Sequence, residues 1–238
     1  MARNEKIGAK SDGTVSGTEN IFQKTTSFFN RYQQIIYGVL IGLLIVIFAI
    51  IALNRFYFEP RNQRAATQIL VPIQYYTQAV QSGDTAQFNL ALEGDDQSDG
   101  FLNIISSYKM TKVANTSRYY AGLCYLNMGL TDEALDYFLK FKKKENVYWY
   151  AAQMLIGDLY GQQGEDSKAI KYYSKAAKGE SPYYTPIALF KLGQMYEKEG
   201  NWKNALSSYE KVENQFYKEY QSMGVERYLE RAKINASK

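Results

Sequence analysis

The sequence predicts an all-α protein, in which a single N-terminal transmembrane helix is followed by a helical solenoid of repeated helix pairs. Three observations predict this fold. The stretch from Ile35 to Leu53 has no charged residue, glycine and alanine recur downstream every 35 to 36 residues, and only 4 of the 238 residues are proline. Such a recurrence is typical of stacked helix pairs, whose interiors exclude proline.

Residues 35–53 have the length of a membrane-spanning helix. At 1.5 Å per residue they extend over roughly 28 Å, which is close to the hydrocarbon thickness of a bilayer. A core helix of a soluble protein would keep a polar face, and this segment has none. The apolar run is longer than the ~7–15 residues of a cleaved signal sequence, and no Ala-x-Ala pair ends it. We therefore expect an uncleaved anchor over residues 35–53.

Gly38 and Gly42 lie four residues apart in the anchor, so they share a helix face on which another membrane helix could pack closely. Glycine is also common in membrane spans without such a role. We expect residues 1–34 to form an N-terminal tail that is polar and disordered through residue 20. Within this tail, the segment from Ile21 to Tyr32 is either a short amphipathic helix at the membrane interface or the start of the anchor.

The basic residues beside the anchor do not decide its orientation. Lys24 and Arg31 precede the span, whereas Arg55, Arg61 and Arg64 follow it closely. Because basic residues favour the cytoplasmic side, the count is ambiguous or leans slightly towards a cytoplasmic location of the large C-terminal part.

Three segments downstream of the anchor align without gaps over five positions. Each has a leading glycine, an aromatic residue, a second glycine, an alanine and a second aromatic residue. The three sets are Gly122, Tyr125, Gly129, Ala134 and Phe138; Gly157, Tyr160, Gly164, Ala169 and Tyr173; and Gly193, Tyr196, Gly200, Ala205 and Tyr209.

Each of these positions has a structural reason. The leading glycine and the alanine are small, which allows the two helices of a pair to approach closely. The second glycine is expected to end the first helix, as a C′ glycine does. The aromatic residues are expected to fill the layer between stacked units.

The pattern resembles the tetratricopeptide repeat, a helix pair of 34 residues, and the resemblance covers residues 115–217. One departure is Phe141, which occupies a position where the family usually has a small residue. On either side we expect further helices. Residues 54–114 should form a linker helix and a degenerate first pair, with helices over Gln63–Gln81 and Phe101–Val113. Residues 218–238 should cap the stack with a helix over Gln221–Ala236.

In this register the first helix of each pair lines a concave groove that suits an extended or helical segment of another polypeptide. Only Asn127 and Lys198 could grip a terminal carboxylate, and because they lie in different repeats we expect no carboxylate clamp. The alternative is that the groove side chains only pack on neighbouring repeats or on a helix that folds back. The candidate groove residues are Tyr119, Leu123, Asn127, Met154, Asp158, Gln162, Phe190, Gln194 and Lys198.

The composition argues against an enzyme and against a nucleic-acid-binding protein. The chain has no histidine, and its single cysteine, Cys124, therefore has no imidazole to activate it. The net charge is only +4, which is too small to drive binding to phosphate backbones. We expect no catalytic residue, no cofactor and no metal site.

In the order of its parts, its size and its anchor position, the chain resembles the YfgM-like family, the ancillary subunit of the bacterial SecYEG translocon. The stretch Ala91-Leu92-Glu93-Gly94, followed by Gly100-Phe101-Leu102 and then Tyr120-Ala121-Gly122, looks like members from the Bacteroidota.

This resemblance implies a single-pass inner-membrane protein with a cytoplasmic N-terminus. Its repeats, within residues 54–238, would lie in the periplasm and work with a PpiD-like chaperone beside SecYEG on emerging secretory chains. Two alternatives stay open. One is a scaffold subunit of another cell-envelope assembly or secretion complex, and the other is a mitochondrial import receptor with cytosolic repeats.

Overall fold

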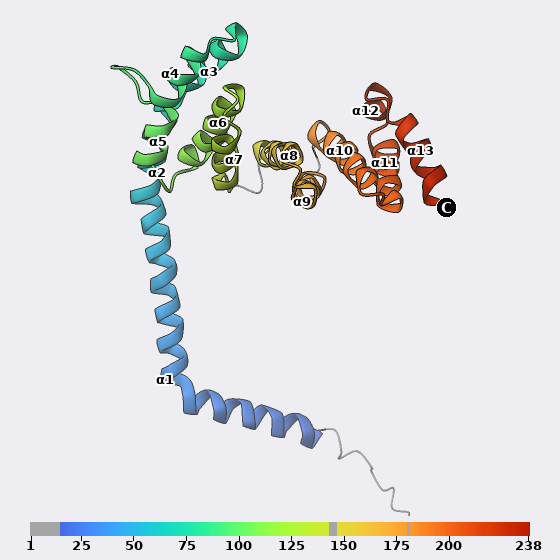
Figure 1. Cartoon of the computed structure of the whole chain (residues 1–238). Coiled ribbons are helices and arrows are strands. Elements are labelled where there is room, and N and C mark those ends of the chain that lie inside the picture. The colour runs from blue at the N-terminus through green and yellow to red at the C-terminus, as the bar shows by residue number, and fades with distance from the viewer. Residues whose placement is uncertain (1–14, 143–146, 180) are drawn as a thin grey trace, which may run out of the picture. The chain divides into compact units, whose positions relative to one another are not determined.

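The computed structural model describes residues 15–142, 147–179 and 181–238, apart from the side chains of residues 15–31 and of Val147. The chain divides into two compact units, Met1–Tyr57 and Phe58–Lys238. Figure 1 shows that both units are built from helices, and no strand occurs in the described ranges. The predicted all-α class is therefore confirmed.

The first unit consists mainly of helix α1, Val15–Leu53, which continues into the π-helical segment η1, Asn54–Phe58. Its apolar side chains are exposed, with 63% of Ile35 and 73% of Phe48 accessible. By length and composition, the helical stretch from Tyr32 is long and apolar enough to cross a membrane, and it is the one such stretch among the described residues. The predicted apolar helix is present.

The start of α1 corrects one expectation. Because the helix begins at Val15, residues 15–20 are helical and not disordered, while residues 1–14 lie outside the described residues. The segment from Ile21 to Tyr32 belongs to α1, and Figure 1 shows that α1 bends sharply in its blue first part. Both interpretations of this segment, an interfacial helix and the start of the anchor, stay predictions.

The second unit is a succession of helices that pack on their neighbours in chain order, and Figure 1 shows the pairs α6/α7, α8/α9 and α10/α11 in its green, yellow and orange parts. The helices are α2 Glu59–Gln68, α3 Leu70–Ser82, α4 Thr85–Glu93, α5 Phe101–Ser107, α6 Lys112–Asn127, α7 Thr131–Lys140, α8 Val147–Gln162, α9 Asp166–Ala176, α10 Tyr184–Lys198, α11 Trp202–Gln215, α12 Tyr217–Ser222 and α13 Glu226–Ala236.

Two predicted flanking helices are each broken into two. The expected helix over residues 63–81 is interrupted at Ile69, between α2 and α3. Pro72 explains the break, because it has no N–H to donate to the carbonyl of Gln68 four residues earlier. The expected helix over residues 221–236 is interrupted before α13, where Gly224 adopts a φ of +61°.

The predicted helix over Phe101–Val113 is also wrong. Helix α5 ends at Ser107, and α6 starts independently at Lys112. Thr111 is the reason, since its hydroxyl accepts a hydrogen bond from the Ala114 N–H at 3.0 Å and caps the new helix.

The leading glycines pack as predicted against the second helix of their own pair. A Cβ at Gly122 would lie 2.7 Å from the ring of Phe138, and one at Gly157 would lie 2.7 Å from the ring of Tyr173. Gly193 meets Tyr209 in the same way. Because these aromatic residues are buried, each glycine sets the distance between the two helices of its pair.

The second glycines end the first helices, as predicted. Gly129, Gly164 and Gly200 have φ angles of +77°, +75° and +70°. The next N–H in each case turns back to a carbonyl of the last turn, for example from Leu130 to Tyr125 at 2.9 Å. This arrangement is a C-terminal cap that only glycine adopts without strain.

The acidic loop between α4 and α5 is organised by one side chain. Asp95 Oδ1 accepts hydrogen bonds from the N–H groups of Gln97 and Ser98 at 2.9 and 2.8 Å, and its Oδ2 accepts one from the Tyr75 hydroxyl at 2.5 Å. These donors, Tyr75 foremost, lower the pKa of the Asp95 carboxyl to about 2.

Replacing Tyr75 by phenylalanine should move the Asp95 pKa up from about 2 towards its ordinary value of 3.8. A carboxyl with a lowered pKa stabilises the folded loop above the ordinary value, and this contribution is lost as the pH falls through the folded pKa. Carbon-13 NMR of the Asp95 carboxyl measures the midpoint. A midpoint near 3.8 in the unaltered protein would show that the tyrosine contact does not form.

Candidate protein-binding surface on the first helices

The predicted groove residues lie on α6, α8 and α10, the first helices of the three repeated pairs, and they differ in exposure. Tyr119 is buried and only 7% exposed. Its ring packs against Phe141 and Tyr148, with centroids 5.6 and 5.1 Å apart. Tyr119 therefore belongs to the core under the surface, and its assignment as an open groove residue is corrected.

Phe190 is covered by the C-terminal helix. Its ring meets Tyr228 of α13 edge to face at a centroid distance of 4.9 Å, and it also approaches Tyr209 at 6.0 Å. Phe190 therefore packs on a terminal helix that folds back over the array, as the alternative interpretation of the groove residues predicts. Phe190 is half-buried and contributes to the capping interface.

The polar candidates form hydrogen bonds within the array. The amide of Asn127 donates to the Leu123 carbonyl at 2.7 Å. The ammonium of Lys198 pairs with Asp166 Oδ1 at 2.7 Å. Asn127 and Lys198 thus have separate partners inside the chain.

Asp158 is the centre of a polar cluster that joins two repeats. Its Oδ1 accepts a hydrogen bond from the Tyr173 hydroxyl at 2.6 Å and pairs with Lys191 Nζ at 2.5 Å. Burial and the hydrogen bond to Asp158 raise the pKa of Tyr173, so its hydroxyl stays protonated and continues to donate. Since Lys191 comes from the next repeat, spacing within one repeat could not have identified this partner.

Leu123 and Met154 are half-buried, Gln162 is exposed and Gln194 is half-buried. Among the described residues, the amides of these two glutamines form no hydrogen bond. These four residues form no polar contact through their side chains among the described residues, and their role in binding stays a prediction.

A cluster of tyrosines, which sequence reasoning missed, packs mostly in the same core as Leu123. We call Tyr76, Tyr119, Tyr120, Tyr148 and Tyr184 the tyrosine cluster. Tyr120 meets Tyr76 and Tyr119 at centroid distances of 5.5 and 5.8 Å. Burial and a hydrogen bond with Tyr148 raise the pKa of Tyr120 to about 12. The only sequence signal was the high tyrosine content of 22 residues, which does not specify positions.

All members of the tyrosine cluster except Tyr119 are half-buried, so each keeps part of its side chain accessible. Tyrosine on such a surface offers a rigid apolar ring together with a hydroxyl that can form hydrogen bonds. This is why tyrosine is enriched in protein interfaces. The surface has the chemistry of a polypeptide-binding site.

Replacing Tyr173 and Tyr209 by phenylalanine should have opposite effects, although the two residues occupy equivalent repeat positions. Tyr173→Phe loses a hydrogen bond to a carboxylate and should lower the free energy of unfolding by about 1–2 kcal/mol. The Tyr209 hydroxyl is buried with no hydrogen-bond partner among the described residues, so Tyr209→Phe should be neutral or stabilise by up to about 1 kcal/mol.

Denaturant unfolding of both variants, followed by far-ultraviolet circular dichroism, measures this difference. Equal losses in the two variants would contradict the assignment of the Asp158 hydrogen bond.

The fold and this surface define a helical-repeat protein with an array of the polypeptide-binding type. The tetratricopeptide repeat family matches residues 116–145, 150–178 and 188–212. The three helix pairs are therefore tetratricopeptide repeats, and such repeats act as protein–protein interaction modules.

The chain is also similar to solved structures. The crystal structure of MamA protein is 18% identical with a TM-score of 0.50, and the match covers 72% of this chain and 90% of that chain. A second match is the Podosopora anserina putative kinesin light chain with nearly identical TPR-like repeats, which is 14% identical with a TM-score of 0.47 over 75% of this chain and 97% of that chain. No curated protein sequence matches significantly. At 18% identity the match to MamA indicates the fold alone.

Proposed function

We propose that this protein is a membrane-anchored protein–protein interaction module. The observation that carries the proposal is the joining of a long, exposed apolar helix to a tetratricopeptide-repeat array. From Ile35 onward α1 exposes its isoleucine, leucine, valine and phenylalanine side chains over its whole circumference. Such a surface is unfavourable in water and favourable in the hydrocarbon of a bilayer.

The anchor also provides a face for a second membrane helix. Side chains built at Gly38 and Gly42 would meet no atom of the described chain within 4 Å. This small-residue face would therefore contact lipid or the transmembrane helix of a partner, where close backbone approach strengthens packing.

The repeats supply the surface that holds a segment of another polypeptide. The tyrosine cluster offers flat apolar rings, and Leu123 and Met154 add half-buried apolar side chains. The amides of Gln162 and Gln194 can bond to the backbone of a bound segment. Mixed apolar and amide chemistry of this kind suits an extended or helical segment without strong charge.

We further propose that the partner is the SecYEG translocon with a PpiD-like chaperone, and that the bound segments belong to emerging secretory proteins. The support is the resemblance to the YfgM-like family in the order of parts, the size and the anchor position. In this arrangement the N-terminus is cytoplasmic and the repeat domain is periplasmic.

Photo-crosslinking from the first helices in intact cells tests this function. A photoreactive benzoylphenylalanine at Met154 or Gln194 should form adducts with SecY, a PpiD-like chaperone or exported chains, which mass spectrometry identifies. The matched control is Lys211, which is exposed on the second helix α11. Adducts confined to another envelope complex would instead favour a scaffold subunit, and adducts of equal yield from Lys211 would exclude the first-helix surface.

Cysteine labelling tests the proposed orientation. Cys124 is buried, and burial raises the pKa of its thiol to about 12, so it should not react in the folded protein. A cysteine introduced at Ser237, near the exposed C-terminus, should react with a membrane-impermeant maleimide added to cells with a permeabilised outer membrane. Labelling only after lysis of the inner membrane would place the repeats in the cytoplasm.

A further inference from the structure

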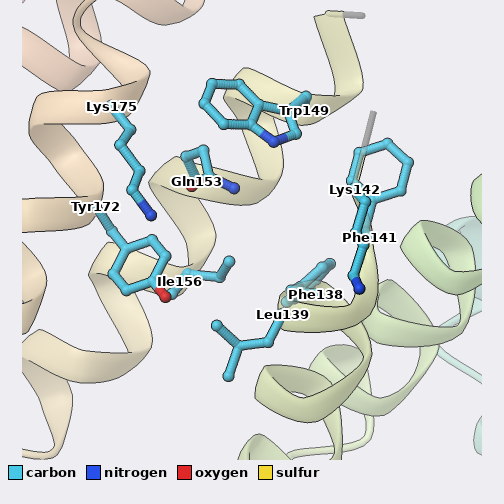
Figure 2. Close-up of a pocket in the computed structure, with 9 residues that line it drawn as sticks. All are labelled: Phe138, Leu139, Phe141, Lys142, Trp149, Gln153, Ile156, Tyr172 and Lys175. Carbon is cyan, nitrogen blue, oxygen red and sulfur yellow. The ribbon is translucent and has the colours of Figure 1, made fainter. Parts of the chain in front are cut away.

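A pocket of about 380 Å³ lies between α7, α8 and α9, at the junction of the first and second repeats. Figure 2 shows the side chains from the three helices around it. Its walls are mostly aromatic and aliphatic, and its lining residues are Phe138, Leu139, Phe141, Lys142, Trp149, Gln153, Ile156, Tyr172 and Lys175.

The pocket lies where the first repeat departs from the pattern at Phe141, which lines it. At the equivalent positions the other repeats have Ala176 and Val212, which are buried within α9 and α11. Helix α7 ends one residue earlier, at Lys140, and Phe141 is in an extended conformation with φ −78° and ψ 114°. Phe141 and Lys142 therefore line the pocket from beyond the end of α7.

The pocket does not belong to the proposed first-helix surface. On α8 it is lined by Trp149, Gln153 and Ile156, whereas the groove candidates on the same helix are Met154, Asp158 and Gln162. At 3.6 residues per turn the two sets lie about half a turn apart around the helix axis. A ligand of the pocket would therefore contact the array on a different side.

The pocket contains a polar side chain, Gln153, that has no hydrogen-bond partner among the described residues. Gln153 is 4% exposed, and its side-chain amide forms no hydrogen bond with any described residue. Figure 2 shows it on α8, between the side chains that come from α9 and those that come from α7. Because this amide lines the pocket and no described residue bonds to it, it is suited to bond with the backbone of a bound chain.

The charged lining residues, Lys142 and Lys175, are both basic, and among the described residues neither forms an ion pair. Lys175 Nζ lies 4.0 Å from the ring centroid of Tyr172. Burial and the neighbouring Lys171 lower the pKa of Lys175, which a nearby carboxylate would reverse. The electrostatic complement of this pocket is therefore an acidic group.

We propose that the pocket between α7, α8 and α9 binds a partner polypeptide in which a large apolar side chain lies next to an aspartate or glutamate. The apolar side chain enters between Trp149 and Tyr172, where it is removed from water. The carboxylate pairs with Lys142 and Lys175, and the Gln153 amide bonds to the backbone of the bound segment. This site goes beyond the proposed function, because it provides a second point of attachment that does not depend on the first-helix surface.

A peptide selection tests the proposal. The full chain, reconstituted in nanodiscs, is exposed to random twelve-residue peptides displayed on phage. Enriched sequences should combine Leu, Ile, Phe or Trp with Asp or Glu within three positions. Binding of the synthetic peptide should fall at least tenfold in the double variant Lys142→Glu, Lys175→Glu. It should change less than twofold in Lys211→Glu, which alters the equivalent position of the third repeat outside the pocket.

A second variant separates binding from folding. Gln153→Leu should leave the unfolding temperature unchanged or higher, because no described residue bonds to the amide, while it weakens peptide binding several-fold. Enriched peptides that bind the double lysine variant as well as the unaltered protein, or an enriched set without acidic residues, would overturn the proposal. If the double lysine variant binds the peptide as well as the unaltered protein does but no longer binds vesicles of anionic lipid, the two lysines contact the membrane and not a peptide. None of these outcomes bears on crosslinking from Met154 or Gln194, so failure here and failure of the proposed function are distinguishable.

Discussion

Replacing Phe138 by alanine should lower the free energy of unfolding by about 3–5 kcal/mol, because the change removes a fully buried ring and leaves a cavity that the helices cannot close. Phe138 is 0% exposed and fills the space over Gly122, where a Cβ would lie 2.7 Å from its ring. Its ring also approaches that of Tyr119, at a centroid distance of 6.0 Å. The residue thus holds α6 and α7 together at the start of the repeat array.

The neighbouring residue provides the control for this variant. Leu139 follows Phe138 on α7 but is 40% exposed, so Leu139→Ala should cost less than about 1 kcal/mol. Guanidinium unfolding of the full chain in a mild detergent measures both variants. Similar losses for Phe138→Ala and Leu139→Ala would mean that the first pair is not packed around Phe138.

The repeated helix pairs could be predicted because their determinants are local. The distance from Gly122 to Phe138, and from Gly157 to Tyr173, spans only one pair, so the same spacing produces the same contact each time. Gly129 ends its helix through its own backbone conformation, with a φ of +77°, and no distant residue is required. Contacts of this kind depend on the spacing of residues within one helix pair and very little on the packing of the other repeats.

The candidate binding surface was harder to predict because its side chains are engaged by other repeats. The ion pair of Asp158 needs Lys191 from the following helix pair, and Phe190 is covered by Tyr228 of the terminal helix. Register places a residue on a helix face, but the neighbouring helix decides whether that face is open. The tyrosine cluster is a case of the same kind, because it forms across four helices.

The flanking helices were mispredicted for a different reason. Apolar periodicity runs through Ile69 and through Tyr108 without interruption, whereas the helices end there because of single backbone groups. Pro72 removes one donor, and the Thr111 hydroxyl supplies a cap to the next helix. A periodic pattern reports which side of a helix is buried and does not report where its hydrogen bonding stops.

Two glycines of helix α8 should respond with opposite signs when they are replaced by alanine. At Gly157 the new methyl group would lie 2.7 Å from ring carbons of Tyr173, whose hydroxyl is held by Asp158 at 2.6 Å. The ring cannot move away without breaking that bond, so overpacking should cost about 1–3 kcal/mol and exceed the gain in helix propensity. At Gly161 the nearest atom, the Cβ of Ala169, is 3.9 Å away, which is an ordinary contact.

Gly161→Ala should therefore stabilise the protein by up to about 1 kcal/mol, because alanine favours a helix over glycine by about that amount. The two variants add the same methyl group to the same helix, so they share every effect except the surroundings of the new Cβ. Their unfolding free energies, measured by denaturant titration under identical conditions, should differ by the overpacking cost alone, about 1–3 kcal/mol. If both Gly157→Ala and Gly161→Ala stabilise the protein, the ring of Tyr173 moves to make room for the added methyl group. The close packing of α8 against α9 would then not explain why the repeat has a glycine at position 157.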